Sequence, residues 1–283
     1  MTERLADIRA RIEGIQQLGA VVNAMKGVAA AHAHLAQTQI DAVDGYAATI
    51  SAAMSSVLRP LSTDAARKAE TADSTPGLLV FCAEQGFAGA FSERLLDSLG
   101  SEAETAELFL IGTRGLSIAT ARGIKPHWTA PLPSHTAALP KLANQITTAI
   151  YQAVAYGRID SLDVVFNRLH TGRPQRIRQR LFPIDLARLS PNTTATRPLT
   201  QLPQDTLIYA LGQEYFYAQV CKAALHAFAA ENEARMEAMS AAGNQIAREL
   251  DTFQAMLRRV RQEAITAEII ELGTGAASTQ TRR

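Results

Sequence analysis

Cysteine is scarce in this chain, which has only Cys82 and Cys221 among its 283 residues. Two cysteines cannot build the disulfide framework on which small secreted proteins depend. The N-terminal residues lack the long apolar core of a secretory signal. No run approaches the roughly 20 apolar residues that a membrane-spanning helix needs. We therefore expect a soluble or membrane-peripheral protein of a reducing compartment.

An excess of charge is also missing, since 28 basic residues stand against 27 acidic ones. This balance gives no reason to expect nucleic acid or an anionic membrane surface as the main partner. The six histidines and the carboxylates show no spacing typical of metal ligands. His32 and His34, two residues apart on a predicted helix, cannot face one ion. We predict no metal and no cofactor.

Proline is absent from residues 2–58, and Pro60 closes that stretch. A helix of this length would span about 85 Å at 1.5 Å per residue. Every seventh residue along it is apolar, and a second set offset by three or four residues lies on the same stripe, as in a coiled coil. The first set is Ile8, Ile15, Val22, Ala29, Ala36, Val43, Ile50 and Val57.

The same rhythm returns near the other end of the chain, in Met239, Ile246, Phe253, Val260 and Ala267. We expect this helix to begin near the N-cap residue Asp205, after Pro203, and to end near Leu272 with Gly273 as its stop. Isolated helices are marginal in water, so two such seams predict one antiparallel pair within the chain. The alternative is that both helices wrap around the domain between them. A helix of 57 proline-free residues would, however, be longer than that domain.

Between the helices, the periodicity changes to that of alternating strands and helices. This alternation predicts a mainly parallel sheet covered by helices. Polar residues 61–76 and proline-containing residues 188–202 read as linkers on either side. The expected strands are 77–82, 107–111, 125–128, 162–169 and 176–184, and the expected helices are 92–99, 116–122 and 139–156.

Residues 82–91 follow a predicted strand and open a helix, which is where phosphate-binding loops occur. They lack both the Gly-Lys-Ser/Thr ending of a P-loop and the three-glycine dinucleotide fingerprint. Gly86 and Gly89 more simply permit a tight turn. Glu84 has no paired acid or base, and no serine or cysteine has a nucleophile elbow around it. We expect no catalytic site within the chain.

One basic cluster interrupts the even distribution of charge. Three of its arginines alternate with other residues along a predicted strand and would share one face of it. They form either a solvated outer face or a contact for an acidic surface on a partner subunit. The cluster comprises Arg168, His170, Arg173, Arg176, Arg178 and Arg180.

Four segments together resemble the γ subunit of F-type ATP synthases over nearly the whole chain. Residues 24–31 (Ala-Met-Lys-Gly-Val-Ala-Ala-Ala) resemble a segment of its first helix, and residues 82–92 match a loop after a strand. Residues 231–239 (Glu-Asn-Glu-Ala-Arg-Met-Glu-Ala-Met) are similar to its Ser-Glu-x-Ala-Arg-Met-x-Ala-Met. Residues 261–272 (Arg-Gln-Glu-Ala-Ile-Thr-Ala-Glu-Ile-Ile-Glu-Leu) resemble its terminal motif. The last two segments are the most specific.

The chain departs from that family's pattern at three places. Gly27 replaces a methionine, residues 32–35 lack the usual basic side chains, and Glu84-Gln85 stands where the family has Asp-Arg/Lys. These departures predict a divergent branch, such as an alternative F-type ATPase.

The resemblance implies that the terminal helices form an axle inside a hexamer of three α and three β subunits. It implies a central, mainly parallel α/β (Rossmann-like) domain beside the ε subunit and the c-subunit ring. The chain would turn as a rotor, coupling ion flow to ATP synthesis or hydrolysis without catalysing either itself. It would be a peripheral protein at the cytoplasmic face of the inner membrane. The corresponding segments are 1–60, 61–204 and 205–283.

The resemblance also implies contacts with β. Its catch loops would meet Arg261, Gln262, Thr266 and Glu268, and its acidic levering loop would lie near Met25 and Lys26. Alternatively, Met25 belongs to the seam, Lys26 is solvated, and Arg261 pairs with Glu268 or a neighbouring residue on its own helix. Small and apolar residues at the tip, Ala267, Ile269 and Ile270, suit a low-friction bearing.

Two other functions compete with the rotor. One is a coiled-coil scaffold without a rotary role. The other is an enzyme whose ligand pocket lies at the Gly86 turn and whose helical arms serve oligomerisation.

Overall fold

The computed structural model describes residues 2–58, 75–170, 173–184 and 200–280. They form two compact units, one of residues 1–28 with 236–283 and one of residues 29–235. The long helices α1 (Thr2–Leu58) and α6 (Gln204–Gln280) contribute to both units. Both predicted terminal helices are therefore confirmed. The linker predicted at 61–76 lies largely outside the described residues, as does most of that at 188–202.

The prediction that Gly273 ends the C-terminal helix is wrong, because α6 continues to Gln280. A glycine inside a helix costs only about 1 kcal/mol relative to alanine. Alanines follow it at 276 and 277, and alanine has the highest helix propensity. Gly273, even with Gly275 two residues later, is too weak a stop signal where no proline follows.

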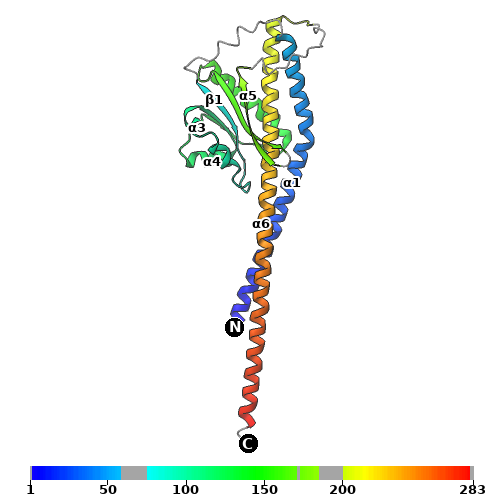
Figure 1. The fold of residues 1–283 in the computed structure, drawn as a ribbon, viewed down its shortest axis with the longest axis vertical. Helices are drawn as coiled ribbons and strands as arrows, with labels where there is room; N and C mark the ends of the chain where they lie inside the picture. The colour runs from blue at the N-terminus through cyan, green and yellow to red at the C-terminus, as the bar shows by residue number, and fades with distance from the viewer. Residues whose placement is uncertain (1, 59–74, 171–172, 185–199, 281–283) are drawn as a thin grey trace. The chain divides into compact units, whose positions relative to one another are not determined.

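The unit of residues 29–235 is built on a five-stranded sheet with the order β3-β2-β1-β4-β5 (Figure 1). Its first four strands run parallel, and β5 is antiparallel to β4. The prediction of a mainly parallel sheet is confirmed, although β3 lies a few residues later than expected. The strands are β1 (Pro76–Phe81), β2 (Glu107–Ile111), β3 (Trp128–Ala130), β4 (Ser161–His170) and β5 (Arg173–Phe182).

Helices cover both faces of this sheet, which is why β1 is apolar without alternation. One face packs against α2 (Phe91–Asp97), α3 (Glu102–Thr105) and α4 (Thr113–Ala121). The other packs against α5 (Leu139–Ala155), reached through a 3-10 turn (Thr136–Ala138), and against α6. The four-residue α3 was not predicted.

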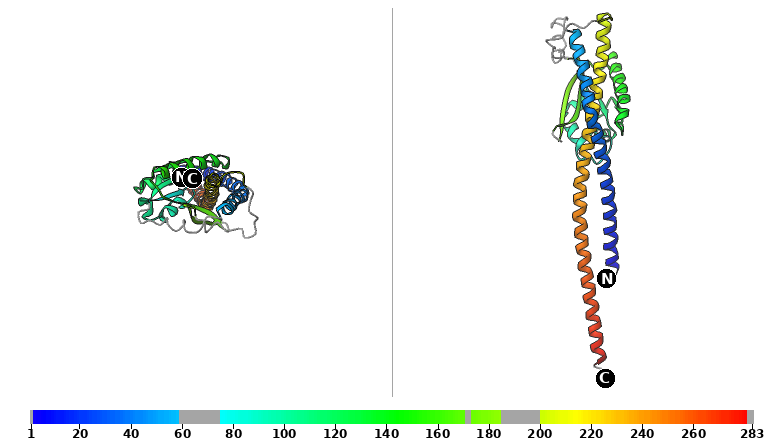
Figure 2. Two further views of the ribbon diagram at one scale, coloured as in Figure 1. Left: turned by 90° about the horizontal axis from the view of Figure 1, so that it is seen from above. Right: turned by 90° about the vertical axis from the view of Figure 1, so that its right-hand side faces the viewer.

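Within this unit, the later part of α1 lies beside the first part of α6, and α5 lies next to α6 (Figure 2). The two long helices run antiparallel, since Asp44 meets His226 while Tyr46 meets Glu214. Tyr151 of α5 packs on Phe216 of α6, with ring centroids 5.5 Å apart. The predicted antiparallel pairing is thus present here.

His226 ties α6 to α1 and to the sheet. Its Nε2 lies 3.2 Å from the Asp44 carboxylate, which also accepts from the Lys222 ammonium at 3.2 Å. Its ring stacks on Phe166. Burial lowers the pKa of His226 below its ordinary value, with Lys222 and Arg168 acting in the same direction and Asp44 opposing them.

We expect the chain to lose stability on acidification because of His226. Below pH about 6.5 the unfolded chain takes up a proton that the folded chain binds less readily. The free energy of unfolding therefore decreases as the pH is lowered. The slope is at most about 1.4 kcal/mol per pH unit. Urea titrations between pH 7 and 5.5 should show a shallower dependence for His226→Gln than for the wild type. Identical slopes would contradict this.

Candidate functional site

The unit of residues 1–28 and 236–283 is an antiparallel pair of helices, in which the two predicted apolar seams meet. Ile8, Val22, Met239 and Val260 are all buried. The Arg11 guanidinium lies over the Phe253 ring, 5.4 Å from its centroid. Members of both seven-residue repeats therefore meet in this unit, as the sequence predicted, although Ala267 of the second repeat is exposed.

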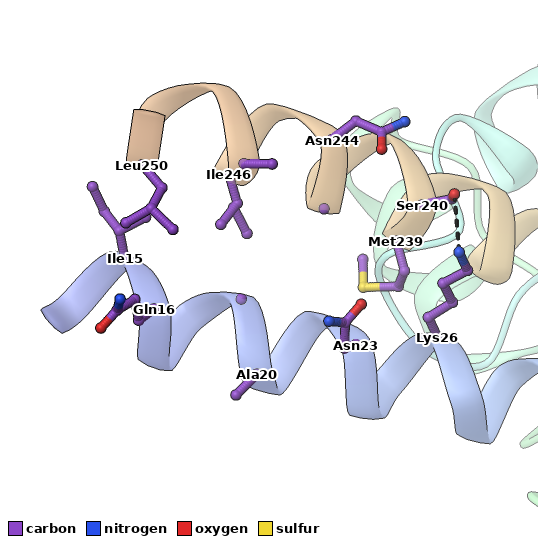
Figure 3. A pocket seen from close by; sticks show the side chains of 13 residues that line it. Ile15, Gln16, Ala20, Asn23, Lys26, Met239, Ser240, Asn244, Ile246 and Leu250 are labelled. Carbon is purple, nitrogen blue, oxygen red and sulfur yellow. Dashed lines mark hydrogen bonds between the residues drawn. The ribbon is translucent and has the colours of Figure 1, made fainter. Parts of the chain in front are cut away.

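A groove of about 400 Å³ interrupts this interface (Figure 3). Its lining includes the small residues Gly19, Ala20 and Gly243. A methyl group at Gly19 would only just touch Ile246, at 3.4 Å. The charged group of its lining is Lys26, whose ammonium donates to the Ser240 hydroxyl at 3.2 Å. The full lining is Ile15, Gln16, Gly19, Ala20, Asn23, Lys26, Met239, Ser240, Gly243, Asn244, Ile246, Ala247 and Leu250.

The structure places the six predicted partner contacts in two environments within this unit. Met25 and Lys26 are half-buried on α1, as the alternative of a seam position for Met25 would also require. The other four, on α6, are exposed: Arg261, Gln262, Thr266 and Glu268.

The α6 segment that carries these four side chains presents an apolar surface to solvent. Ala267, Ile269 and Ile270 are exposed, together with Ile265 and Leu272. In this stretch of α6 Arg259 forms an ion pair with Glu263 at 3.1 Å. Among the described residues, no ion pair joins Arg261 to Glu268.

In the other unit, the loop after β1 is held by a buried ion pair on α6 that the sequence did not single out. Glu231, 3 % exposed, pairs with Arg235 one helical turn later. Its carboxylate accepts the backbone N–H of Glu84 at 3.1 Å and of Gln85 at 3.3 Å. Arg235 donates to the carbonyl of Gly86 at 3.3 Å. Both residues lie in segment 231–239, and the resemblance of this segment to the family motif was the sequence feature that could have pointed to them.

This contact occupies two backbone N–H groups of the loop at the end of β1, which donate to the chain's own carboxylate. Burial raises the pKa of Glu231, while Arg235 and the two N–H donors oppose that rise. The geometry, with donors only around the carboxylate, fits the ionised form.

Glu84 anchors the loop from the other side. Its carboxylate accepts the N–H of Thr113 at 2.9 Å, the Thr113 hydroxyl at 2.7 Å and the N–H of Leu132 at 2.8 Å. Glu84 therefore holds two neighbouring segments in place by accepting their hydrogen bonds, which agrees with its interpretation as a turn residue.

Two members of the basic cluster, Arg178 and Arg180, form ion pairs within the chain. Arg178 meets Asp163 and Glu102, each at 2.8 Å, and Arg180 also meets Asp163. The strand register puts Arg176, Arg178 and Arg180 on one face, as predicted. Arg168 and His170 are exposed on β4, and the side chain of Arg173 lies outside the described part. This arrangement favours the interpretation of a solvated outer face. Because β5 is an edge strand of the sheet, its charged side chains also discourage pairing with a strand of another molecule.

None of the helices in the described part of the chain could cross a bilayer. The same residues include no group of three or more His, Cys, Asp or Glu side chains placed to hold a metal ion.

Comparison with protein-family models matches residues 4–279 to the family described as ATP synthase. Among curated proteins, the chain is 27% identical over 281 residues to the ATP synthase gamma chain of Moorella thermoacetica, covering 96% of this chain and 98% of that one. It is 26% identical over 301 residues to the gamma chain of Gluconobacter oxydans, covering 96% and 98%.

Two solved structures share the fold. One is the rotor of Euglena gracilis mitochondrial ATP synthase, with a TM-score of 0.66, 14% identity and coverage of 94% of this chain and 100% of that one. The other is a chain of the OSCP/F1/c-ring assembly of the same enzyme, with a TM-score of 0.67, 14% identity and coverage of 100% and 97%.

Proposed function

Since the chain belongs to the ATP synthase gamma-subunit family, we propose that it is the central-stalk rotor of an F-type ATP synthase. It turns inside a hexamer of three α and three β subunits and so couples ion flow across the membrane to ATP synthesis or hydrolysis. The observation that carries this proposal is the family match over residues 4–279. The antiparallel pairing of both chain ends supports it physically.

In this role the chain catalyses nothing itself. In the loop that has the position of a phosphate site, the backbone N–H groups of Glu84 and Gln85 donate to the Glu231 carboxylate. The rotor works instead through shape, since an asymmetric shaft holds the surrounding β subunits in different states. The helices in segments 1–60 and 205–283 supply the shaft, and segment 61–204 supplies the foot beside the ε subunit and the c-subunit ring. The complex would hold the chain peripherally, at the cytoplasmic face of the inner membrane.

The contacts with β are part of the proposal. The exposed side chains of Arg261, Gln262, Thr266 and Glu268 meet the catch loops, and Met25 with Lys26 lies near the levering loop. Support comes from the exposure of the first four, which lie on α6 among apolar side chains that are exposed in the described part of the chain.

We expect Arg261→Ala to weaken coupling only modestly. An exposed ion pair contributes at most about 1 kcal/mol, which corresponds to less than about fivefold. The measurement is ATP-driven ion pumping relative to ATP hydrolysis in membrane vesicles. Arg259→Ala is the matched control, because that guanidinium pairs with Glu263 within the helix. Complete loss of pumping by an assembled Arg261→Ala complex would show that this contact contributes far more.

Co-purification tests the function itself. A tagged copy expressed in its native host should bring down two larger ATPase subunits, about three copies of each, together with a membrane ring. A scaffold without a rotary role would bring down neither in that ratio. An enzyme would turn over substrate as the purified chain, whereas we expect the purified chain to hydrolyse no ATP.

A further inference from the structure

His226 connects three elements of the unit of residues 29–235 at one buried point. It belongs to α6, is 4 % exposed, and stacks its ring on Phe166 of β4. Its Nε2 lies 3.2 Å from the Asp44 carboxylate of α1. Because an ionised carboxylate only accepts, Nε2 carries the proton of the neutral ring, and a second proton would enter at Nδ1. Protonation therefore places a charge on a largely buried ring and adds an N–H donor that the described residues do not pair.

The charges around this imidazole oppose its protonation. The charged groups that face it are Asp44 of α1, Lys222 of α6 and Arg168 of β4. The Asp44 carboxylate is already paired, since it accepts from the Lys222 ammonium at 3.2 Å. A protonated His226 would share that one carboxylate with Lys222 and would add to the positive charge of Arg168. His32, a further titratable group of α1, packs on a phenylalanine ring of α6 with centroids 5.9 Å apart.

We propose that the Asp44–His226 contact is a pH-sensitive switch, in which protonation of His226 opens residues 29–58 of α1 from α6 while the sheet of the same unit stays folded. The switch acts through a single proton. One proton changes the opening equilibrium by at most about tenfold per pH unit.

The way in which α1 is held in this unit explains why the opening is local. Its fully buried apolar side chains are mostly small, and each alanine removes little apolar surface from water. Polar contacts with α6 therefore carry more of its attachment, namely those of Asp44 and the hydrogen bond from Tyr46 to Glu214. The buried apolar side chains are Ala29, Ala33, Ala36, Ile40, Ala47 and Met54.

The connectivity of the chain gives such an opening a consequence for the rotor. The two units are joined at two points of the chain, in α1 between residues 28 and 29 and in α6 between residues 235 and 236. Torque between the units would therefore pass through these two helices. With α1 open, α6 alone would be firmly held in the unit of residues 29–235, and coupling would weaken at acid pH. This consequence rests on the proposed function, whereas the switch itself does not.

Amide hydrogen exchange of the full-length chain tests the switch. After correction for the intrinsic exchange rate, protection of α1 residues 36–50 should fall by up to about tenfold per unit between pH 7 and 5.5. At both pH values it should stay at least about tenfold below the protection of β1, because α1 opens without global unfolding. His226→Gln should remove the pH dependence, since its amide can donate to Asp44 but does not titrate. His34→Gln is the matched control, because it removes an exposed imidazole of the same helix, and it should keep the wild-type dependence.

Three results would overturn the switch: protection of α1 that does not change with pH, the same dependence in His226→Gln as in the wild type, or equal protection of α1 and β1 at pH 5.5. The consequence for coupling is measured in membrane vesicles, as ATP-driven pumping relative to hydrolysis at pH 7 and pH 6. The ratio should decline more for the wild type than for His226→Gln, and equal declines would overturn that step. If the wild-type chain formed no complex with the hexamer, the proposed function would fail, and hydrogen exchange would still decide on the switch.

Discussion

Replacing Glu231 by alanine should lower the free energy of unfolding by about 3–5 kcal/mol, because it breaks a buried ion pair on one side only. The Arg235 guanidinium, itself largely buried, would lose its counter-charge. The N–H groups of Glu84 and Gln85 would lose their acceptor. Urea unfolding followed by circular dichroism and by fluorescence of the single tryptophan, Trp128 of β3, measures the loss in this unit.

The same helix offers a matched control with the same spacing. Arg259 and Glu263 also pair across four residues, but their side chains are 82% and 47% exposed. Glu263→Ala should cost no more than about 0.5 kcal/mol. The double variant Glu231→Leu with Arg235→Met should lose less than Glu231→Ala alone, since no unpaired charge stays buried. Equal losses for Glu231→Ala and Glu263→Ala would contradict the assignment of the first pair as a buried clamp.

Gly112→Ala should destabilise the chain by more than about 3 kcal/mol, a cost that combines backbone strain with a steric clash. Gly112 joins β2 to α4 with φ of 106°, a conformation open to glycine. A Cβ atom there would lie 2.5 Å from the Cys82 carbonyl oxygen and 2.6 Å from that of Ala83. Both oxygens belong to the backbone at the end of β1, so neither can rotate away.

Gly100→Ala separates the clash from the strain. Gly100 also has positive φ, at 56°, but a Cβ atom would meet nothing within 4 Å. The cost should therefore stay near 1–2 kcal/mol. Urea midpoints of the two variants at matched denaturant slope give the comparison. A loss for Gly112→Ala no larger than that for Gly100→Ala would show that the end of β1 yields to the added methyl group.

Most of the fold could be predicted because its signals are local and repeated. A proline-free stretch of 57 residues with an apolar residue at every seventh position fits few structures other than a helix. Helix α1 spans this stretch, from Thr2 to Leu58. The buried strands β1 and β2 are short continuous apolar runs, which is what a sheet covered on both faces requires. Where the signal was a single residue it failed, since Gly273 does not end α6.

The clamp on the β1 loop could not be predicted in the same way. Glu231 and Glu84 are 147 residues apart, and neither has a local pattern that names the other. Glutamate and arginine four residues apart on a helix ordinarily indicate a surface pair, and only the packing of α6 against the sheet turns this one inward. Likewise, the sequence placed Phe87 in a glycine-containing turn but gave no sign of its positive φ of 62°.

Single-molecule rotation tests the central claim most directly. With the αβ hexamer immobilised, a bead would be attached to the foot through Tyr156→Cys. The native cysteines should not compete, because Cys82 is buried with its pKa raised to about 12 and burial also raises the pKa of Cys221. The rotor account predicts that ATP drives the bead in one direction, with three steps per turn for three β subunits. ATP hydrolysis by the complete complex while the bead stays still would contradict it.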